Sequence, residues 1–543
     1  MTWIHPLSPD VEETADVLGG KAHGLVVLQR LGLRVPPGFV INTTACRAFL
    51  RDGRLPDGLD AELAAAVAEL EAATGRTLGG PERPLAVSVR SGSSVSMPGM
   101  MATILNLGLS AEATAGMAAE TGDARFALDS RLRFLSSFAS AVTGLDAARL
   151  EASVHESAEH EVGDDEAALA GAIRRVEYLI RQRGGAPVPD DATRQLELAV
   201  AAVFFSWNTP RAETYRELHD IPHDLGAAVT VQAMVFGNRD HRSGSGVAFS
   251  RNPNTGAHVP FGEVLFGRQG EDVVSGRSQT RPLHELAERE PAVWSALLEA
   301  TDRIEAHHRD ACYLEFTFEA GELWFLQLRP GRFVGGAAVR VAVDLADEGT
   351  IGRREALLRV SPQQLQHVRT PRIVTAGEAD VLTRGLGACP GVAVGRVATT
   401  ADDAARMAAD GPVILVRPET SPLDMHGLAA AAGVVTARGG PASHAAVVAR
   451  AMGKPAVVGV ADLTVDVADA AVRAGGQTVR EGTLIAIDGT GGEVVIGSPR
   501  TVTAADEPHL HRLLEWADDV SGDHADRTEV ERLSAAHAVL RHD

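Results

Sequence analysis

The sequence predicts a multi-domain α/β protein, and three features support that prediction. At 543 residues the chain is longer than one hydrophobic core usually supports. Short Val, Ala, Ile and Leu runs alternate with Gly- and Pro-rich turns, and 55 residues are glycine. Other stretches, rich in Ala, Glu, Leu and Arg, have helical spacing, and 45% of all residues are hydrophobic. We therefore expect an α/β (α+β) architecture of several compact domains.

Residues 1–335 are expected to form the first domain. The segment LGGKAHGLVVLQRLGLRVPPGFVI (18–41) mixes helical and strand-like runs, residues 61–75 predict a helix, and PLAVSVRSG (84–92) predicts a strand. Residues from about 110 to 200 predict a helical insertion. Strand-like runs return from about 226 and end in CYLEFTFEAGELWFLQLRPG (312–331), which predicts a hairpin with its turn at Ala320 and Gly321.

The rest of the chain is divided into three parts. Residues 336–380 contain two amphipathic segments, AVRVAVDLADEG and REALLRVSPQQLQ, which we interpret as a helical linker rather than as core. Residues 381–500 repeat the pattern of short apolar strands and Gly-rich turns, which predicts a second compact α/β domain. Residues 501–543 are acidic and predict a helical tail.

Charge and targeting signals indicate the compartment and the partners. The formal net charge of −21 argues against nucleic acid as the main partner, because phosphate backbones bind to basic surfaces. No apolar run is long enough to span a bilayer, so no membrane partner is expected. The start of the chain, MTWIHPLSPDVEETADVLGG, lacks the layout of a signal peptide, and the three cysteines form no CxxC pair. We expect a cytoplasmic protein; its oligomeric state stays open, with a homodimer as one candidate.

The basic residues are distributed unevenly between arginine and lysine. Of 51 basic residues only Lys21 and Lys454 are lysines, and both lie in Gly-rich motifs. A compact ammonium group is not interchangeable with a planar guanidinium at a tight phosphate site. Both lysines are therefore candidate phosphate contacts, with chance as the alternative for each.

The segment GGPASHAAVVARAMGKPAVVG (439–459) carries the clearest chemistry. A glycine pair followed by a small-residue run that begins at Ser443 predicts a helix with His444 at its N-terminus. Free backbone N–H groups and the helix dipole favour an anion at that position. Since imidazole is a nucleophile near neutral pH, the position suits a covalent phosphoenzyme intermediate, with an ordinary surface or capping histidine as the alternative. Arg438 and Arg450 are candidates for neutralising phosphate charge, with an ordinary surface charge as the alternative.

This segment resembles the phosphohistidine signature of the pyruvate phosphate dikinase family, which includes phosphoenolpyruvate synthase. The upstream RPETSPLDMHGLAAAAGVVTARGG is similar to the dikinase version. The segments LGGKAHGL, VPPGF, SVRSGSSVSMPGMMATILNLG, SWNTPRAETYR, VQAMVFGN and GSGVAFSRNPNTG follow in the family's order. The resemblance implies an ATP-grasp nucleotide-binding domain with a helical insertion, joined to a swivelling phosphohistidine domain.

The resemblance also implies roles for individual residues. His444 is the phosphorylated residue, and Lys21, Arg90 and Arg329 complete the catalytic set. Nucleotide contacts are expected at Lys21, Arg90, Gly99, Met234, Val235, Glu271, Glu315, Gln327 and Arg329. Magnesium contacts are expected at Glu315, Glu271 and Gln327, because Mg²⁺ prefers hard oxygen ligands. ATP, Mg²⁺ and inorganic phosphate are the expected cofactors and co-substrate, with AMP and pyrophosphate as products.

Three departures from the family pattern bear on function. Tyr313 stands where the family usually has an aspartate, two residues before Glu315, and Ala442 stands where it usually has a threonine, two residues before His444. The resemblance extends to about residue 518, and the sequence does not go on into the family's C-terminal barrel for pyruvate or phosphoenolpyruvate. We therefore expect the phosphate acceptor to be either a separate barrel protein or another small molecule bound directly.

Two alternatives remain at this point. One is a small-molecule phosphotransferase resembling rifampin phosphotransferase, although the linker is too short for that enzyme's dedicated substrate domain. The other is a non-catalytic regulator or scaffold in which Tyr313 has disabled catalysis. Acceptor screening discriminates the first, and production of AMP discriminates the second.

Overall fold

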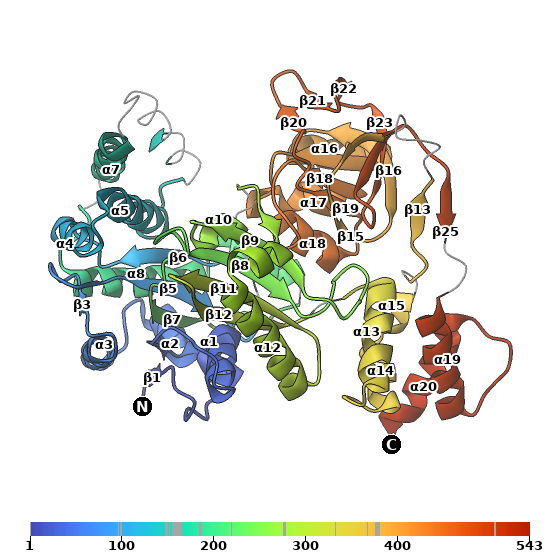
Figure 1. The fold of residues 1–543 in the computed structure, drawn as a ribbon, viewed down its shortest axis with the longest axis horizontal. Helices are drawn as coiled ribbons and strands as arrows, with labels where there is room; N and C mark the ends of the chain where they lie inside the picture. Colours follow the sequence, from blue (N-terminus) through green and yellow to red (C-terminus); the bar gives the residue numbers. More distant parts are fainter. Residues whose placement is uncertain are drawn as a thin grey trace. The chain divides into compact units, whose positions relative to one another are not determined.

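The structure, a computed structural model, describes residues 2–95, 97, 100–146, 150, 153–154, 165–183, 187–218, 220–274, 278–331, 333–365, 368–374, 381–503 and 507–542. The chain divides into two compact units (Figure 1). The first comprises Met1–Arg239 and Trp324–Leu328, and the second comprises Asp240–Leu323 and Arg329–Asp543. Within the described ranges, none of the helices combines the length and the hydropathy needed to cross a lipid bilayer.

A five-stranded sheet of the order β1-β2-β7-β5-β6 forms the centre of the first unit. Its strands are β1 (Ile4–Pro6), β2 (Gly38–Ile41), β5 (Val87–Gly92), β6 (Thr103–Leu107) and β7 (Ala228–Ala233). All neighbours run antiparallel. Because side chains alternate along a strand, Val87 and Val89 on β5 face the same way as Val229 and Val231 on β7, and all four belong to the unit's core. The opposite face carries Arg90 and other polar side chains.

Helices cover this sheet, and they fill the described part of the stretch from 110 to 200. The helices are α1 (Ala15–Arg30), α2 (Thr43–Asp52), α3 (Leu59–Thr74), α4 (Ala111–Thr121), α5 (Ala124–Phe138), a π-helical turn (Ala139–Thr143), α7 (Asp165–Gln182), α8 (Ala192–Ser206) and α9 (Pro210–Leu218). A short parallel pair, β3 (Thr77–Leu78) and β4 (Pro84–Leu85), precedes β5.

The second unit begins with another sheet, of the order β10-β9-β8-β11-β12. Its strands are β8 (Gly244–Phe249), β9 (Phe261–Phe266), β10 (Arg281–Pro282), β11 (Cys312–Glu319) and β12 (Glu322–Pro330), of which Trp324–Leu328 is counted with the first unit. Its helices are α10 (Gly270–Val274), a 3₁₀ turn (Leu283–Glu285), α11 (Leu286–Arg289) and α12 (Pro291–His308). The expected hairpin is confirmed: β11 and β12 are neighbours, and Ala320 and Gly321 between them have φ of 51° and 82°, as a tight hairpin turn requires.

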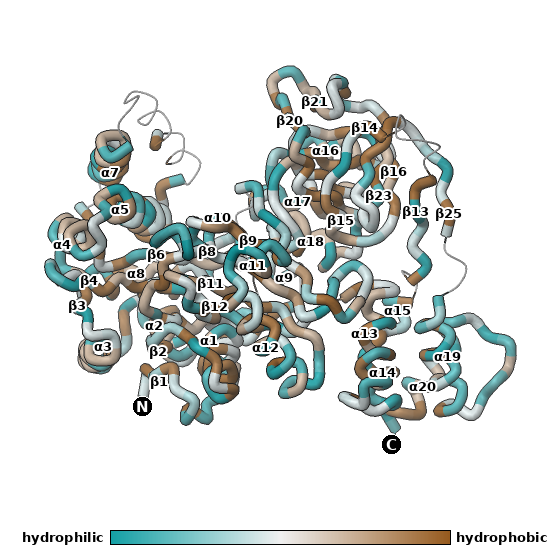
Figure 2. Tube along the Cα trace, viewed as in Figure 1, coloured by the Kyte–Doolittle hydropathy of each residue, from teal (hydrophilic) through white to brown (hydrophobic). Residues whose placement is uncertain are grey.

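A helical cluster is built from two distant parts of the chain. It contains α13 (Gly335–Asp347), α14 (Arg353–Arg359), α15 (Pro362–Leu365), α19 (Pro508–Ser521) and α20 (Glu529–His542). Val343 and Leu357 share one apolar core with Leu514 and Leu533, and Figure 2 shows the apolar colour of α13. The apolar faces of the amphipathic helices α13, α14 and α15 are thus covered by α19 and α20.

The helical cluster continues into a larger sheet through a short ribbon. In this ribbon β13 (Pro371–Ile373) pairs antiparallel with β25 (Thr501–Thr503) (Figure 1). Asp488, 1% exposed, fastens the ribbon by accepting hydrogen bonds from Arg372 Nε at 3.0 Å and from the Ile373 N–H at 2.9 Å. Both connections between the cluster and the sheet therefore run side by side.

The larger sheet has eight strands in the order β14-β24-β23-β16-β17-β18-β19-β15. They are β14 (Val381–Arg384), β15 (Leu386–Cys389), β16 (Val392–Ala398), β17 (Val413–Arg417), β18 (Gly433–Thr436), β19 (Ala456–Val458), β23 (Leu484–Asp488) and β24 (Glu493–Ile496). Around it lie α16 (Ala401–Met407), α17 (Met425–Ala430), α18 (His444–Met452), and a small sheet of β20 (Thr464–Asp466), β21 (Ala471–Ala474) and β22 (Gln477–Arg480). Strands β16 to β19 run parallel, so the loops after β17 and β18 lie at one edge.

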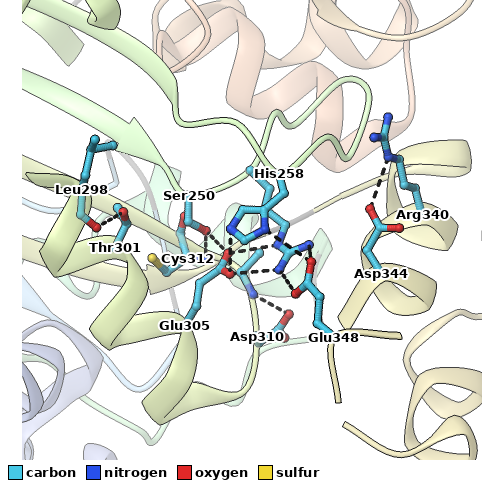
Figure 3. A network of polar contacts seen from close by, with 12 residues as sticks. Ser250, His258, Leu298, Thr301, Glu305, Asp310, Cys312, Arg340, Asp344 and Glu348 are labelled. Carbon is cyan, nitrogen blue, oxygen red and sulfur yellow. Dashed lines mark hydrogen bonds and ion pairs between the residues drawn. The ribbon is translucent and has the colours of Figure 1, made fainter. Parts of the chain in front are cut away.

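A buried arginine joins the first sheet of this unit to the helical cluster. Arg251, 0% exposed, follows β8 and forms ion pairs with the carboxylates of Glu305 and Glu348, which are labelled in Figure 3. Glu305 on α12 accepts hydrogen bonds from Nε of this arginine at 3.1 Å and from Nη2 at 3.0 Å. Glu348, which follows α13, accepts from Nη1 at 3.2 Å and from Nη2 at 2.7 Å. His258 lies against both carboxylates, with Nδ1 3.3 Å from Glu348 Oε1. This double bidentate geometry fixes the orientation of α13 against the sheet.

Candidate active site

His444 is the first residue of α18, as the sequence predicts. The helix follows β18 through a loop of residues 437–443, called here the His444 loop, and Ser443 caps it with an extended backbone (φ −61°, ψ 158°). The first backbone N–H groups of a helix have no partner within the helix, and the dipole adds positive potential there. A phosphoryl group on the half-buried imidazole would therefore lie in a favourable field.

Thr420 sets the orientation of the imidazole. Its Oγ1 lies 3.0 Å from Nδ1 of His444. The two residues meet because Thr420 follows β17, His444 follows β18, and parallel neighbours end at the same edge of a sheet. When Nδ1 carries the ring proton and donates it to Thr420 Oγ1, Nε2 keeps the lone pair that nucleophilic attack requires.

Ion pairs surround this edge of the sheet. Arg438 Nη2 lies 2.5 Å from Glu419 Oε2, and Arg417 Nε lies 3.3 Å from Asp424 Oδ1. Asp424 also closes a capping box with Ser421, which orders the turn after Thr420. The side chain of Arg438 is about half exposed, so this arginine lies at the surface near His444.

The His444 loop packs against β9 of the same unit. The backbone N–H of Ala442 donates to Glu263 Oε1 at 3.0 Å, and Thr280 Oγ1 donates to Oε2 at 2.6 Å. A Cβ on Gly440 would lie 1.6 Å from Glu263 Oε2, so only glycine lets the loop approach this closely. Burial raises the pKa of Glu263, and the charge of Arg450 partly opposes that rise.

Arg450, in the last turn of α18, and Lys454, two residues after the helix, both have structural partners. Arg450, buried, donates from Nη1 to Ala388 O at 2.9 Å and from Nη2 to Pro441 O at 2.5 Å, so it holds the His444 loop through a backbone carbonyl. Lys454 Nζ donates to the carbonyls of Leu428, Ala429 and Ala431 at the end of α17. An ammonium group with three hydrogens suits three converging carbonyls, which explains why this position is a lysine without assigning it to phosphate.

The two departures from the family pattern lie in one cluster. Ala442 packs with Val247, Leu265 and Val273, and Tyr313 packs against the same group. The Tyr313 hydroxyl lies 3.5 Å from Glu315 Oε1, and its ring contacts Phe249 edge-on at 4.9 Å. Burial, with the charge of Glu315, raises the pKa of the Tyr313 phenol.

Glu315 and Arg329 also belong to this neighbourhood. Both are predicted nucleotide contacts, and Arg329 Nη2 lies 3.7 Å from Glu315 Oε1. Arg329 also lies over the Tyr313 ring at 5.8 Å. Glu271 lies on α10, in the same short helix as Val273 of the Ala442 cluster. The structure therefore brings Glu315 and Arg329 together and places Glu271 on a neighbouring element.

In the first unit, α1 positions Lys21 against the end of β5. Gly19 interrupts α1 with a φ of 74°, and a Cβ there would lie 2.7 Å from Gly92 O. A Cβ on Gly92 would in turn lie 3.3 Å from Lys21 Cβ. The glycines thus allow the helix to approach the strand that carries Arg90, and Lys21 comes to the same end of the sheet.

The Arg90 side chain lies on the polar face of β5 and β7. Its Nη2 donates to Gln232 Oε1, and to the carbonyl of Leu326 at 3.1 Å. Leu326 belongs to the segment Trp324–Leu328 that clusters with this unit, and the next residue is Gln327, 3% exposed. Met234 and Val235 directly follow β7, and the Met234 N–H donates to Ala86 O at 2.9 Å. Gly99 lies outside the described residues.

Sequence reasoning missed Thr420, Glu263 and Gln232. Thr420 lies in a quoted motif, but nothing local indicates that its hydroxyl meets His444. Gln232 also lies in a quoted motif, VQAMVFGN, and Glu263 lies on a strand that carries no quoted motif. Within the described part of the chain, no three His, Cys, Asp or Glu side chains converge as a metal centre, so the predicted magnesium contacts stay a prediction.

These two folds, an ATP-grasp nucleotide-binding domain and a mobile domain with a histidine at a helix N-terminus, define a class of phosphohistidine proteins. Residues 15–291 match the family model described as pyruvate phosphate dikinase, AMP/ATP-binding domain, and residues 409–492 match that of the PEP-utilising enzyme, mobile domain. The first match alone covers more than half of the chain. The chain belongs to the pyruvate phosphate dikinase family.

Curated relatives agree with this assignment. Pyruvate, phosphate dikinase 2 of Zea mays is 42% identical over 514 residues, which cover 93% of this chain and 58% of the maize protein. Pyruvate, phosphate dikinase of Rhizobium meliloti is 41% identical over 554 residues, covering 97% of this chain and 61% of the relative. The chloroplastic pyruvate, phosphate dikinase of Flaveria trinervia is 42% identical, covering 92% and 54%. The chain thus spans somewhat more than half the length of these relatives.

Proposed function

We propose that this chain is an ATP-dependent phosphotransferase in which His444 takes a phosphoryl group from ATP and passes it to an acceptor. The observation that carries the proposal is the hydrogen bond between Thr420 and Nδ1 of His444 at the first turn of α18. With the ring proton on Nδ1, Nε2 is the attacking nitrogen, and the helix N-terminus stabilises the negative charge of the phosphoryl group that the imidazole takes up.

The nucleotide is assigned to the polar groups of the ATP-grasp fold. Lys21 and Arg90, both in the first unit, are proposed to supply positive charge for phosphate oxygens. Arg329 is a further proposed nucleotide contact. Transfer to an imidazole is an in-line displacement that depends mainly on positioning and charge neutralisation. The matched family model, described as an AMP/ATP-binding domain, supports ATP as the donor. In the proposed reaction inorganic phosphate takes the terminal phosphoryl group to form pyrophosphate, His444 takes the β-phosphoryl group, and AMP leaves.

Magnesium fits one part of this arrangement. Mg²⁺ is usually held by one or two carboxylates together with phosphate oxygens and water. Glu315, whose side chain is 21% exposed, offers one such carboxylate, and Tyr313 occupies the place of a second. Glu271 and Gln327 are the further proposed contacts. Bound there, the ion would neutralise phosphate charge.

The acceptor is proposed to be either a pyruvate-like molecule on a separate barrel protein or another small molecule. The relatives are pyruvate, phosphate dikinases, and this chain spans 54–61% of their length. The oligomeric state stays open, with a homodimer as one candidate. A screen of acceptors with the phosphorylated chain, followed by phosphorus NMR of the products, distinguishes the two acceptors.

The decisive experiment labels the histidine. The chain is incubated with ATP labelled at the β-phosphorus, Mg²⁺ and inorganic phosphate, and then digested for phosphopeptides. We expect label on His444, equimolar AMP, and no label in His444→Ala. His426→Ala serves as the control, because it removes an exposed imidazole that pairs with Asp402 at 2.8 Å, and it should keep the label on His444. Label that survives in His444→Ala, or a wild-type chain that releases no AMP, contradicts the proposal.

One observation favours a second candidate, a non-catalytic regulator. Tyr313 fills the position of a metal-binding carboxylate and packs against the Ala442 cluster. A regulator would bind ATP without releasing AMP, and His444→Ala would keep its biological effect. The AMP assay therefore separates the two candidates.

A further inference from the structure

The polar face of β5 and β7 contains a glutamine that bridges two motifs. Gln232 is 1% exposed, and in the sheet it lies opposite Ser88 on β5 and Gly38 on β2. Its Oε1 accepts from Arg90 Nη2, and its Nε2 donates to Pro36 O at 3.1 Å. Both ends of the amide are used, so the side chain has a single orientation.

The VPPGF segment is shaped around this side chain. A Cβ on Gly38 would lie 2.8 Å from Gln232 Cγ and 2.3 Å from Val231 O, so glycine is required where β2 passes the glutamine. The carbonyl of Pro36 is then in place to orient the amide. Pro37 also contributes its carbonyl, which accepts from the Ala233 N–H at 2.9 Å. The segment thus fixes Gln232 from both sides.

Arg90 is held in turn by two acceptors. Nη2 carries two hydrogens, and the acceptors are Gln232 Oε1 and the Leu326 carbonyl at 3.1 Å. Because a guanidinium is planar, two bonds at one nitrogen set the plane of the whole group. A charged group fixed before its ligand arrives loses less conformational entropy on binding.

We propose that Gln232 is a positioning residue that fixes the Arg90 guanidinium for the phosphates of ATP. The inference rests on the proposed function for its ligand, and it names a residue that acts through Arg90 rather than by touching the nucleotide. It also assigns a purpose to the VPPGF motif, which orients Gln232. Gln232 is an amide rather than a carboxylate at this position, which leaves the positive charge of Arg90 available to phosphate.

The test measures ATP binding by calorimetry in the presence of Mg²⁺. Gln232→Met keeps the volume but removes both hydrogen bonds, and it is expected to weaken ATP binding roughly tenfold. Gln232→Glu keeps an acceptor for Arg90 but adds a negative charge beside it, and it is expected to weaken binding at least as much. Unchanged affinity in Gln232→Met overturns the proposal.

A matched control lies in the same unit. Gln195 is also 1% exposed, and it bridges Gly108 N, at 3.1 Å from Oε1, and Pro189 O, at 2.6 Å from Nε2, without contact to Arg90. Gln195→Met therefore removes two similar hydrogen bonds and is expected to lower the melting temperature while ATP affinity stays within twofold. An equal loss of affinity in both variants assigns Gln232 to general stability and overturns the proposal.

A double-mutant cycle provides the specific readout. If Gln232 acts through Arg90, then adding Gln232→Met to Arg90→Met leaves ATP affinity unchanged, whereas two independent losses multiply. Multiplied losses overturn the proposal. If ATP affinity depends on Gln232 through Arg90 but the wild-type chain leaves His444 unlabelled, only the proposed function is contradicted. If the wild-type chain binds no ATP, the proposed function and the role of Gln232 are both contradicted.

Discussion

The carboxylate of Glu263 on β9 accepts a hydrogen bond at 3.0 Å from the backbone N–H of Ala442, two residues before His444. Glu263 is 1% exposed, and the loop approaches it closely because Gly440 has no side chain. An almost fully buried carboxylate thus marks the place where the His444 loop rests against the sheet that carries Glu315.

Glu263→Gln is expected to change how stability depends on pH. Burial raises the pKa of Glu263 above its ordinary value of 4.5, so between 4.5 and the raised pKa the folded chain holds a proton that the unfolded chain releases. This contribution to stability is full below pH 4.5 and is lost as pH rises through the raised pKa, by about 1.4 kcal/mol for each unit of elevation. Glu263→Gln is expected to lack this decrease of the unfolding free energy with rising pH. Urea unfolding at several pH values from 5 to 8 measures the decrease.

The control for this prediction is an exposed glutamate. Glu299 has a side chain 73% exposed and pairs with Arg303 on the surface of α12. Glu299→Gln is expected to unfold in parallel with the wild type across the same pH range. If the curves of Glu263→Gln and the wild type also run in parallel, the carboxylate does not gain its proton on folding.

Thr420→Val is expected to slow phosphorylation of His444. Valine matches threonine in shape but removes the bond to Nδ1, and a net hydrogen bond of about 1 kcal/mol corresponds to roughly a fivefold to tenfold slower rate. The measurement is the rate of label incorporation from ATP. Thr420→Ser keeps the hydroxyl and serves as control; equal rates in valine and wild type would show that the imidazole is oriented by other groups.

The features that the sequence predicts are those that depend on residues adjacent to one another in the chain. The position of His444 follows from Gly439, Gly440 and Ser443, and the hairpin turn follows from Ala320 and Gly321, because turn and cap preferences are local. The contact between Glu263 and Ala442 spans 179 positions and that between Arg90 and Gln232 spans 142. Such pairs are set by strand order, which local patterns do not contain.

The helices between residues 335 and 365, together with Lys454, show what local sequence patterns leave out. Val343 and Leu357 form an apolar face whose partners, Leu514 and Leu533, lie far along the chain, so each amphipathic segment alone resembles a solvated connection. Lys454 is distinctive in composition, yet its partner groups are backbone carbonyls of α17, including Leu428 O at 3.0 Å. Backbone carbonyls have no signature in the sequence.

Tyr313→Asp is expected to strengthen the dependence of ATP binding on Mg²⁺. The hydroxyl of Tyr313 lies 3.5 Å from Glu315, so an aspartate adds a second carboxylate near the first. Without Mg²⁺ the two like charges and the lost contact with Phe249 should destabilise the chain by roughly 2–4 kcal/mol. Calorimetry of ATP with and without Mg²⁺ measures the first effect, and thermal unfolding measures the second.

Tyr313→Asn is the matched control, because it removes the same ring without adding charge. It should destabilise the chain while leaving the dependence on Mg²⁺ as in the wild type. Should Tyr313→Asp and Tyr313→Asn respond to Mg²⁺ alike, the position does not contribute to a metal site.

Arg251→Met is expected to be the most destabilising of these substitutions. The guanidinium is 0% exposed and is the shared partner of Glu305 and Glu348, so its removal leaves two carboxylates facing each other beside His258 (Figure 3). Removing one partner of a buried ion pair typically costs about 3–5 kcal/mol. Arg340 pairs with Asp344 at 3.3 Å on the half-exposed side of α13, so Arg340→Met should cost less than about 1 kcal/mol. Denaturant unfolding compares the two variants, and equal losses would mean that the buried network does not hold α13 against its sheet.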